Sequence, residues 1–452
     1  MKDLTTGRIG LQIFRFALPM LIGQMFQQLY TFVDQIIVGN FLGKEALAAV
    51  GASFPIIFTL IALVIGVASG GTIVISQFFG AKDFRMVKRA IDTVFIMLFA
   101  AALILTAIGF PFIEQIFRLI QLPEELMDMG VSYLSVYIGG LILFFGYNGV
   151  AAILRGLGDS ITPLYFLILA TVLNIGLDLL FIVVLGWGVA GAAWATLMAQ
   201  GTAFIAAALY LNKHHELIKF NIRNFSFDKK VFRESMRIGL PTGLQHTFVA
   251  LGMMALIGIV NTFGTNVTAA YTAAGRIDSL AVIPAMVFAQ ALATYVGQNM
   301  GAGKIERVNR GLWTTLFMSS VVSLIMTAVV IVFKYPLMGW FTDDVTVINI
   351  GGDYLTIVTS FYLIFTSMFI FGSVMRGAGD TLIPMFITLF ALWFIRIPAA
   401  FILSKEWGET GIWWSIPIGW TMGMVLTLIY YRMGRWKSKV VVKAAVSPEI
   451  PD

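Results

Sequence analysis

The sequence contains no cysteine and few charged residues. Without cysteine the chain has no disulfide, no thiolate metal site and no thiol nucleophile. Charged residues make up 12% of the 452 positions, whereas about a quarter is usual in soluble proteins. Hydrophobic residues make up 59% and recur in runs of helical length, which excludes a water-soluble enzyme and a disordered chain. The composition therefore indicates a membrane protein with many spans.

Apolar segments long enough to cross a bilayer, at ~20 residues each, recur along the whole chain. Their even spacing and the lack of period-two alternation favour helices over an outer-membrane barrel. The first segment is too long and too polar for a cleavable signal peptide. We therefore expect an all-α membrane protein with twelve transmembrane helices, at 10–38, 46–78, 90–116, 126–154, 161–185, 189–211, 231–262, 267–299, 310–333, 346–375, 383–403 and 410–432.

The excess of basic residues, 30 Lys and Arg against 24 Asp and Glu, has two readings: nucleic-acid binding, or cytoplasmic loops rich in positive charge. Their distribution decides, because with the N-terminus inside, nearly all of them fall on the cytoplasmic side. The exceptions are Lys44, Arg118, Lys334 and Lys405 outside, and Arg276 and Arg396 within spans. We therefore expect cytoplasmic N- and C-termini, and no nucleic-acid partner.

The chain repeats itself. Residues 155–159, RGLGD, return as RGAGD at 376–380, an offset of 221 residues. Each half holds six spans, an even number, so both halves enter the membrane in the same orientation and the repeat is parallel. We expect a six-helix lobe at 1–211, a cytoplasmic linker at 212–230, a second six-helix lobe at 231–435 and a cytoplasmic tail at 436–452. Two six-helix bundles are typical of transporters.

Ionisable side chains in the middle of a span are costly unless paired, so they are candidates for function, with a structural ion pair as the alternative. The second half has a candidate polar cluster of Arg276, Asp278 and Arg396, in which Asp278 could pair with Arg396. In the first span, Pro19 removes a backbone hydrogen bond and is a candidate conformational switch. Gly66 and Gly70 form a G-x-x-x-G pattern that is typical of close helix packing.

Polar side chains from four spans of the first half reach one depth. Asp34, Tyr133, Asp178 and Thr196 lie ~6–11 Å below the outer ends of their predicted helices, and Asn174 shares a helix face with Asp178. This coincidence indicates a shared site.

The second half offers an internal control for this site. The positions that match Asp34, Asn174 and Asp178 in the repeat are Leu256, Ile395 and Ala399. The fold is repeated without the acidic residues, which favours a functional role for them. Two carboxylates in a low dielectric cannot both be ionised cheaply, and a proton or a Na⁺ ion relieves that cost. We therefore expect a coupling-ion site and no other metal or cofactor.

These motifs resemble, nearly end to end, the multidrug and toxic compound extrusion (MATE) family, and within it the DinF-like branch. The matching stretches are Leu18-Pro19-Met20, Tyr30 to Asp34, 80–82, 154–159, Leu173-Asn174 through Asp178, and 188–193. The resemblance implies that Asp34, Asp178, Asn174, Tyr133 and Thr196 hold the coupling ion. The chain departs from some members at Ala151, where they have a further asparagine, and it lacks the acidic residues that another branch uses in spans 7 and 10.

The resemblance further implies a secondary antiporter that exports amphipathic, often cationic, compounds in exchange for H⁺ or Na⁺. We expect a monomer in the cell (inner) membrane whose partners are small amphipathic substrates and the lipid bilayer. The alternative within the superfamily is a lipid-linked oligosaccharide flippase, which is expected to show a strongly cationic cleft, whereas only Arg276 and Arg396 lie within spans. An intramembrane enzyme would need a catalytic constellation that the sequence does not show.

Overall fold

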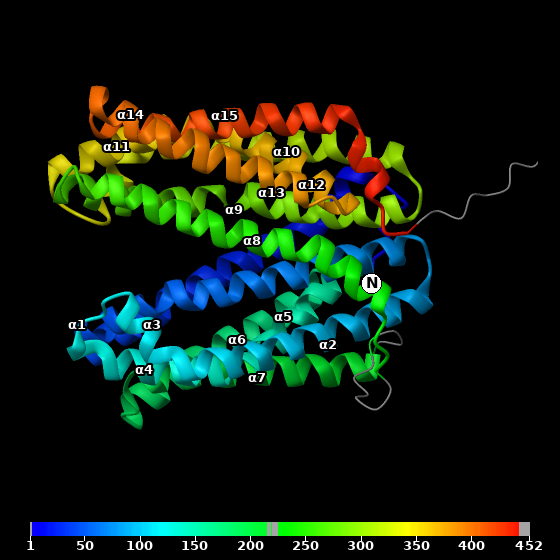
Figure 1. Cartoon of the computed structure of the whole chain (residues 1–452), viewed down its shortest axis with the longest axis horizontal. Coiled ribbons are helices and arrows are strands. Elements are labelled where there is room, and N and C mark those ends of the chain that lie inside the picture. The colour runs from blue at the N-terminus through cyan, green and yellow to red at the C-terminus, as the bar shows by residue number, and fades with distance from the viewer. Residues whose placement is uncertain (1, 215–217, 219–224, 443–452) are drawn as a thin grey trace, which may run out of the picture. The chain divides into compact units, whose positions relative to one another are not determined.

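The computed structural model describes residues 2–214, 218 and 225–442. The predicted linker at 212–230 and the predicted tail at 436–452 therefore lie partly outside the described residues. Helices form nearly all of the described chain, and no strand occurs in this part of it (Figure 1).

The first two spans form one element, α1 (Ile9–Gly80), of 72 residues. At ~1.5 Å per residue such a helix is more than three times as long as the ~30 Å hydrocarbon core is thick. Its one non-helical residue is Gly43, with φ 88° and ψ −178°, a conformation that glycine adopts at little cost. The spans predicted at 10–38 and 46–78 are therefore joined at Gly43 without a loop.

The other spans of the first half follow the prediction closely. They comprise α2 (Phe84–Gly109), extended by η1 (Phe110–Phe112) and α3 (Ile113–Leu119); α4 (Glu124–Gly139) with α5 (Leu141–Gly156); α6 (Ile161–Asp178) with the π-helical η2 (Leu179–Val184); and α7 (Gly188–His214). Helices α4 and α5 form one span that is bent by 51°.

The second half repeats these features. It comprises α8 (Lys229–Asn261), α9 (Thr265–Gly301), α10 (Ile305–Gly339), α11 (Val345–Thr359) with α12 (Tyr362–Ala378), α13 (Leu382–Leu389) with the π-helical η4 (Phe390–Arg396) and α14 (Ile397–Trp407), α15 (Glu409–Met433) and η5 (Arg435–Lys439). Helices α11 and α12 are bent by 46°. Nine helices and two bent pairs of the described chain qualify as spans, and α1 counts twice. The predicted fold, twelve helices in two six-helix bundles related by a parallel repeat, is confirmed.

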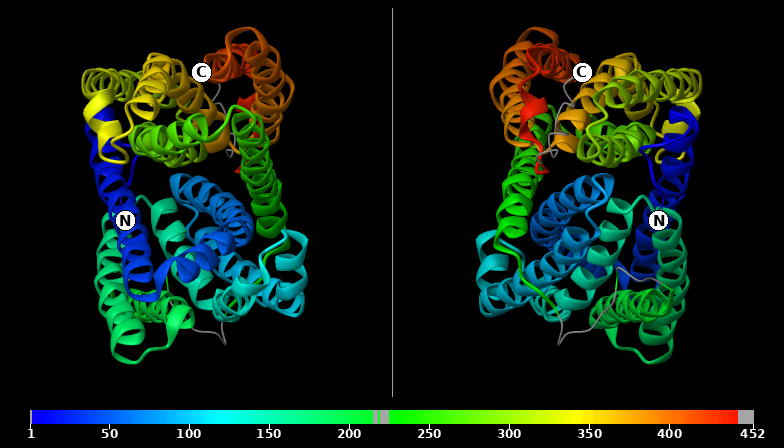
Figure 2. Two further views of the ribbon diagram at one scale, coloured as in Figure 1. Left: turned by 90° about the vertical axis from the view of Figure 1, so that its left-hand side faces the viewer. Right: turned by 90° about the vertical axis from the view of Figure 1, so that its right-hand side faces the viewer.

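The described chain forms two compact units, each a bundle of helices (Figure 2). The first unit contains residues 2–3 and 18–243, and the second contains 4–17 and 244–442. The chain therefore passes from one unit to the other inside α1, after Ala17, and inside α8, after Gly243.

Glycines bring α1 and α8 together within the first unit. A Cβ atom on Gly66 would lie 2.6 Å from the Gly239 carbonyl oxygen, and one on Gly70 would lie 2.2 Å from that of Ser235. Only glycine permits so close an approach of two backbones, so the predicted packing role of Gly66 and Gly70 is confirmed.

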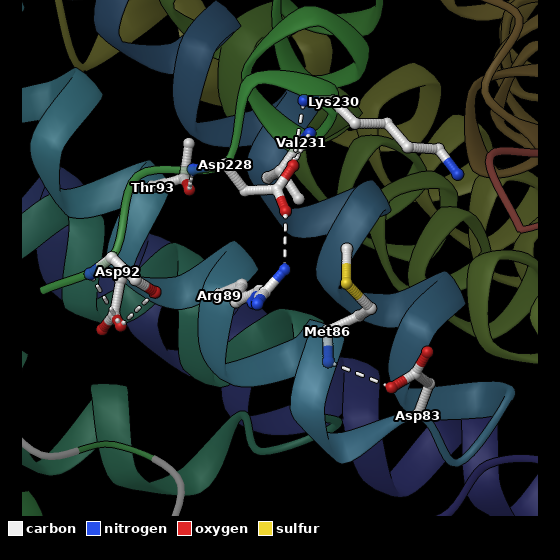
Figure 3. A network of polar contacts seen from close by, with 9 residues as sticks. Asp83, Met86, Arg89, Asp92, Thr93, Asp228, Lys230 and Val231 are labelled. Atoms are coloured by element: carbon white, nitrogen blue, oxygen red, sulfur yellow. Dashed lines mark hydrogen bonds and ion pairs between the residues drawn. The ribbon is translucent and has the colours of Figure 1, made fainter.

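The start of α8 is bound to α2 through Asp228 (Figure 3). One carboxylate oxygen of Asp228 caps the helix by accepting hydrogen bonds from the backbone N–H groups of Lys230 (2.9 Å) and Val231 (3.1 Å). The other lies 3.4 Å from Nη1 of Arg89, and the Asp228 N–H donates to Oγ1 of Thr93 at 3.0 Å.

The segment before α1 is held in a similar way within the second unit. The N–H of Leu4 donates to Oε1 of Gln298 at 2.9 Å, and Nη1 of Arg307 donates to the Gly7 carbonyl at 3.1 Å. Each crossing helix, α1 or α8, is thus preceded by a segment fixed by side-chain hydrogen bonds.

Candidate functional site

The polar site predicted for the first half is assembled inside the first unit. Helix α1 supplies Asp34, α4 supplies Tyr133, α6 supplies Asn174 and Asp178, and α7 supplies Thr196. All five side chains are buried, and Asp178 has no exposed surface. The structure therefore brings the predicted residues into one buried region, to which the bundle contributes four separate spans.

Hydrogen bonds organise this region around Asn174. The Asn174 amide is oriented so that both its nitrogen and its oxygen form a hydrogen bond. The nitrogen donates to Oδ2 of Asp178 at 2.9 Å, and the oxygen accepts from the Thr196 backbone N–H at 3.2 Å. The Thr196 hydroxyl in turn accepts a hydrogen bond from Tyr30 Oη at 3.0 Å. This chain of bonds fixes the orientation of the Asp178 carboxyl group.

The two aspartates face each other. Their carboxyl groups lie within hydrogen-bonding reach of one another, and Tyr133 lies within electrostatic range of both. One oxygen of each, Oδ1 of Asp34 and Oδ1 of Asp178, is buried and has no hydrogen-bond partner among the described residues. Two adjacent acceptors can satisfy each other only if a proton lies between them or a cation binds to both.

Among the residues that the structure describes, no cationic side chain forms an ion pair with either aspartate. Within this described part of the chain, no group of three or more His, Asp or Glu side chains could hold a metal ion. The site has the oxygen ligands and the negative charge to hold one proton or one monovalent cation.

Local sequence explains why α6 presents this face. Thr171, Asn174 and Asp178 are spaced by three and four residues, so they line one side of the helix. Directly after Asp178 the backbone changes from α- to π-helical in η2. Such wide turns occur often at functional sites because they redirect side chains.

A small cavity lies beside the Tyr30–Thr196 hydrogen bond of the polar site. Its lining includes Tyr30 and Thr196, which also belong to the polar site, and Gln27 and Gln200. Oε1 of Gln200 is buried and has no hydrogen-bond partner in the part of the chain that the structure describes. The enclosed space of the cavity suffices for about one water molecule, so it does not hold a drug-sized compound.

Tyr30, Gln27 and Gln200 line this region but were not predicted as site residues from the sequence. Helical spacing could have found two of them, because Tyr30 lies four residues before Asp34 and Gln200 lies four residues after Thr196. They were missed because a neutral polar side chain within a span carries no charge whose cost would single it out.

Pro19 lies inside α1, two residues after the point where the chain leaves the second unit. The helix continues through Pro19 with helical backbone angles, because Gly43 is the one non-helical residue within α1. The predicted switch residue therefore lies at the passage from one unit to the other, in an unbroken helix.

The candidate cluster of the second half is arranged differently from the prediction. Asp278 accepts a hydrogen bond from Tyr362 Oη at 2.6 Å, and Nη1 of Arg396 lies 3.7 Å from the sulfur of Met253. Among the described residues no ion pair joins Asp278 to Arg396, although Arg396 lies within electrostatic range of that carboxylate. Arg276 is exposed and forms no ion pair in the same part of the chain. Asp278 thus has a phenol as its direct partner.

Comparison with known proteins gives one family. The MatE family model matches the chain twice, at residues 19–180 and 241–402, in agreement with the internal repeat. Two similar relatives are the probable multidrug resistance protein YpnP of Bacillus subtilis, 32% identical over 96% of this chain and 98% of that protein, and the probable multidrug resistance protein NorM of Thermotoga maritima, 26% identical over 95% and 94%.

Solved structures show the same fold. The outward-facing conformation of a multidrug resistance MATE family transporter superposes with a TM-score of 0.90 at 26% identity, over 97% of this chain and 99% of that one. A crystal structure of MATE in the bent conformation gives a TM-score of 0.90 at 27% identity, over 96% and 97%.

Proposed function

This chain belongs to the multidrug and toxic compound extrusion (MatE) family of membrane transporters, and we propose that it is an antiporter that exports amphipathic, often cationic, compounds in exchange for H⁺ or Na⁺. The observation that carries this proposal is the pair of buried carboxyl groups, Asp34 and Asp178, each with an oxygen that has no partner among the described residues. The names of the relatives, multidrug resistance proteins, support the substrate class.

The coupling follows from the cost of buried charge. With neither a proton nor a cation, two adjacent carboxylates repel each other in a low dielectric. One H⁺ or one Na⁺ removes much of that cost, so the ion stabilises the arrangement in which the two groups meet. Asn174, Tyr133 and Thr196 supply the remaining amide and hydroxyl groups.

The same proposal covers placement and branch. We propose that the chain is a monomer in the cell membrane, with one lobe at 1–211 and a second at 231–435. The linker, the tail and both termini lie in the cytoplasm, because the basic residues are concentrated on that side. The DinF-like branch is supported by the set Asp34, Asn174 and Asp178, and the departure at Ala151 bears on which ion is used. No observation favours a flippase.

The experiment is export of a fluorescent cation, ethidium, from proteoliposomes containing the purified protein, driven either by an imposed pH difference or by an imposed Na⁺ gradient. We expect one gradient to drive export, and Asp34→Asn or Asp178→Asn to reduce it to the level of empty liposomes while ethidium binding changes less than about threefold. The matched control is Asp343→Asn, which removes an exposed carboxylate between α10 and α11. Export that is independent of both gradients, or that survives in both single variants, would refute the proposal.

A further inference from the structure

The start of α1 is anchored within the second unit by the turn between α9 and α10. The side chain of Leu4, in the segment before the helix, is almost fully buried. The Leu4 N–H donates to Oε1 of Gln298 at 2.9 Å, and the Leu4 carbonyl accepts from Nδ2 of Asn299 at 3.2 Å. Nζ of Lys304 donates to the carbonyl of Thr5 at 3.0 Å. All of these residues belong to one unit, and we call this set of contacts the α1 anchor.

Arg307 of α10 is the centre of the α1 anchor. Its Nη1 donates to the Gly7 carbonyl at 3.1 Å. Its Nη2 donates to the Leu4 carbonyl at 3.4 Å and to Oε1 of Gln12, in the first turn of α1, at 3.2 Å. Its Nε donates to Oδ1 of Asn299 at 3.1 Å. All three nitrogen atoms of one rigid, planar guanidinium are thus engaged, a geometry that the single ammonium group of a lysine does not provide.

Helix α1 connects this anchor with the ion site. The helix passes to the first unit after Ala17, and Asp34 lies 25 residues after Ile9, about 38 Å along the axis. The backbone between them has helical angles throughout, because Gly43 is the one non-helical residue of α1. A shift of α1 at Asp34 is therefore transmitted to the anchored end or absorbed by a bend at Pro19. A helix with a loose end would shift alone and leave the second unit where it is.

The second crossing helix, α8, has an anchor of its own that is built from different residues. The segment before α8 is held on α2 through Asp228, which contacts Arg89 and Thr93. The position that matches Arg307 in the first half, 221 residues earlier, is Met86, whose side chain has no hydrogen-bond donor. The equivalent turn of the first unit therefore folds without an arginine at this position. This difference indicates that Arg307 serves α1 and not the turn itself.

We propose that Arg307 is a positioning residue for ion-coupled export, which fixes the start of α1 to the second unit so that ion binding at Asp34 moves that unit together with the helix. This inference rests on the proposed export function and adds the connection between the ion site and the second unit. Arg307 acts through α1 and not by touching the ion. Its loss should therefore leave the two binding affinities nearly unchanged and remove the effect of one ligand on the other.

The first measurement is the coupling between the ion and ethidium at equilibrium. Ethidium is titrated by fluorescence anisotropy against the purified full-length protein in lipid nanodiscs, at low and at high concentration of the ion that drives export. We expect the ion to weaken ethidium binding by about fivefold or more in the wild type. In Arg307→Gln this factor should fall below about twofold, while the affinity for ethidium without the ion changes by less than about threefold. Gradient-driven export from proteoliposomes should fall several-fold in the same variant.

The matched control is Arg310→Gln, which removes an exposed cation three residues further along α10 and should leave the coupling factor unchanged. Arg307→Lys keeps the charge but loses the planar fork, so it should give an intermediate factor. A wild type whose ethidium affinity does not respond to the ion would overturn the inference, as would an equal loss in Arg310→Gln. A lower melting temperature of Arg307→Gln with the wild-type coupling factor would show that the α1 anchor only supports the fold, and the proposal would be wrong.

The second measurement replaces the α1 anchor by a covalent bridge. The chain has no cysteine, so Thr6→Cys and Lys304→Cys can be joined by a short bismaleimide without background. Both native side chains are exposed, and Thr6 follows Thr5, whose carbonyl contacts Lys304. In the Arg307→Gln background the bridge should restore both the coupling factor and export. A bridge that leaves both low would refute the proposal, and so would a bridge that stops export while Arg307 is present.

Failure of this inference and failure of the export function give different results. If the wild type exports ethidium with neither gradient, the proposed export function is wrong. If the wild type exports in a gradient-dependent manner and Arg307→Gln keeps the wild-type coupling factor, the export function stands and the role of Arg307 is refuted.

Discussion

The hydroxyl of Tyr30 is a small contributor to the polar site whose removal can be measured. Tyr30→Phe deletes the 3.0 Å hydrogen bond to Thr196 and leaves the ring in place. Since one such bond contributes about 0.5–1.5 kcal/mol, we expect the apparent affinity for the coupling ion to fall by roughly two- to tenfold.

The measurement is the ion concentration that gives half-maximal export of ethidium in proteoliposomes. The control is Tyr165→Phe, because Tyr165 lies on the same bundle, on α6, with an exposed side chain. An unchanged half-maximal concentration in Tyr30→Phe would show that the link from Tyr30 to Thr196 does not support the ion site.

At the same scale, the sequence predicted the acidic residues of the site better than its neutral ones. Asp34 and Asp178 stand out because a carboxyl group inside a span is costly, and helical rise put them at one depth. Tyr30 and Gln200 do not stand out, because neutral polar side chains are common in spans and only their contacts reveal them. The orientation of the Asn174 amide likewise follows from its neighbours and not from spacing.

Among the elements, the close approach of α1 and α8 depends on glycine. Gly70→Ala would place a Cβ atom 2.2 Å from the Ser235 carbonyl oxygen, and because that atom belongs to the backbone, the two helices must separate. We expect a loss of about 1–3 kcal/mol of stability, read as a lower melting temperature of the purified protein in detergent.

The matched control for this substitution lies in the same helix. A Cβ atom on Gly51 of α1 would have no other atom within 4 Å, so Gly51→Ala should raise stability by about 0.5–1 kcal/mol through helix propensity alone. Equal melting temperatures for Gly70→Ala and Gly51→Ala would contradict the packing role of Gly70.

The elements also show where sequence reasoning reaches its limit. Apolar runs of ~20 residues predict spans reliably, because a bilayer requires them. The segment between the first two spans has only Gly43 as a break, so hydropathy alone predicts two separate spans where one long helix with a single kink occurs. The π-helical segments η2 and η4 escaped prediction because tertiary packing, not local composition, produces such wide turns.

For the whole molecule, orientation in the membrane is the first property to test. The chain has no cysteine, so single cysteines can be labelled without background. We expect Lys44→Cys, whose native side chain is 91% exposed, to react with a membrane-impermeant maleimide in intact cells. Arg85→Cys and Lys219→Cys should react only after the cells are opened, because the positive-inside rule places both in the cytoplasm. The opposite pattern would reverse the proposed topology.

The second property is the passage of the chain between the two units. It crosses inside α1 and inside α8, and at each crossing a proline lies within three residues, Pro19 and Pro241. A proline leaves one carbonyl of the preceding turn without its hydrogen bond, so a helix bends there at low cost. Because Asp34 lies on α1 beyond Pro19, binding of an ion at Asp34 can favour one bend of α1 over another.

The energies set the scale of this coupling. Moving a two-state equilibrium from about 1:99 to 99:1 requires ~5.5 kcal/mol of differential ion binding, more than one carboxyl group readily supplies, so we expect Asp34 and Asp178 to act together.

Pro19→Ala restores the missing hydrogen bond and should slow gradient-driven ethidium export several-fold while ethidium binding changes little. Pro241→Ala makes the same change in α8, which has no acidic residue at the position that matches Asp34, and should slow export less. Equal losses in the two variants, or no loss in either, would separate the bend at Pro19 from the ion site at Asp34.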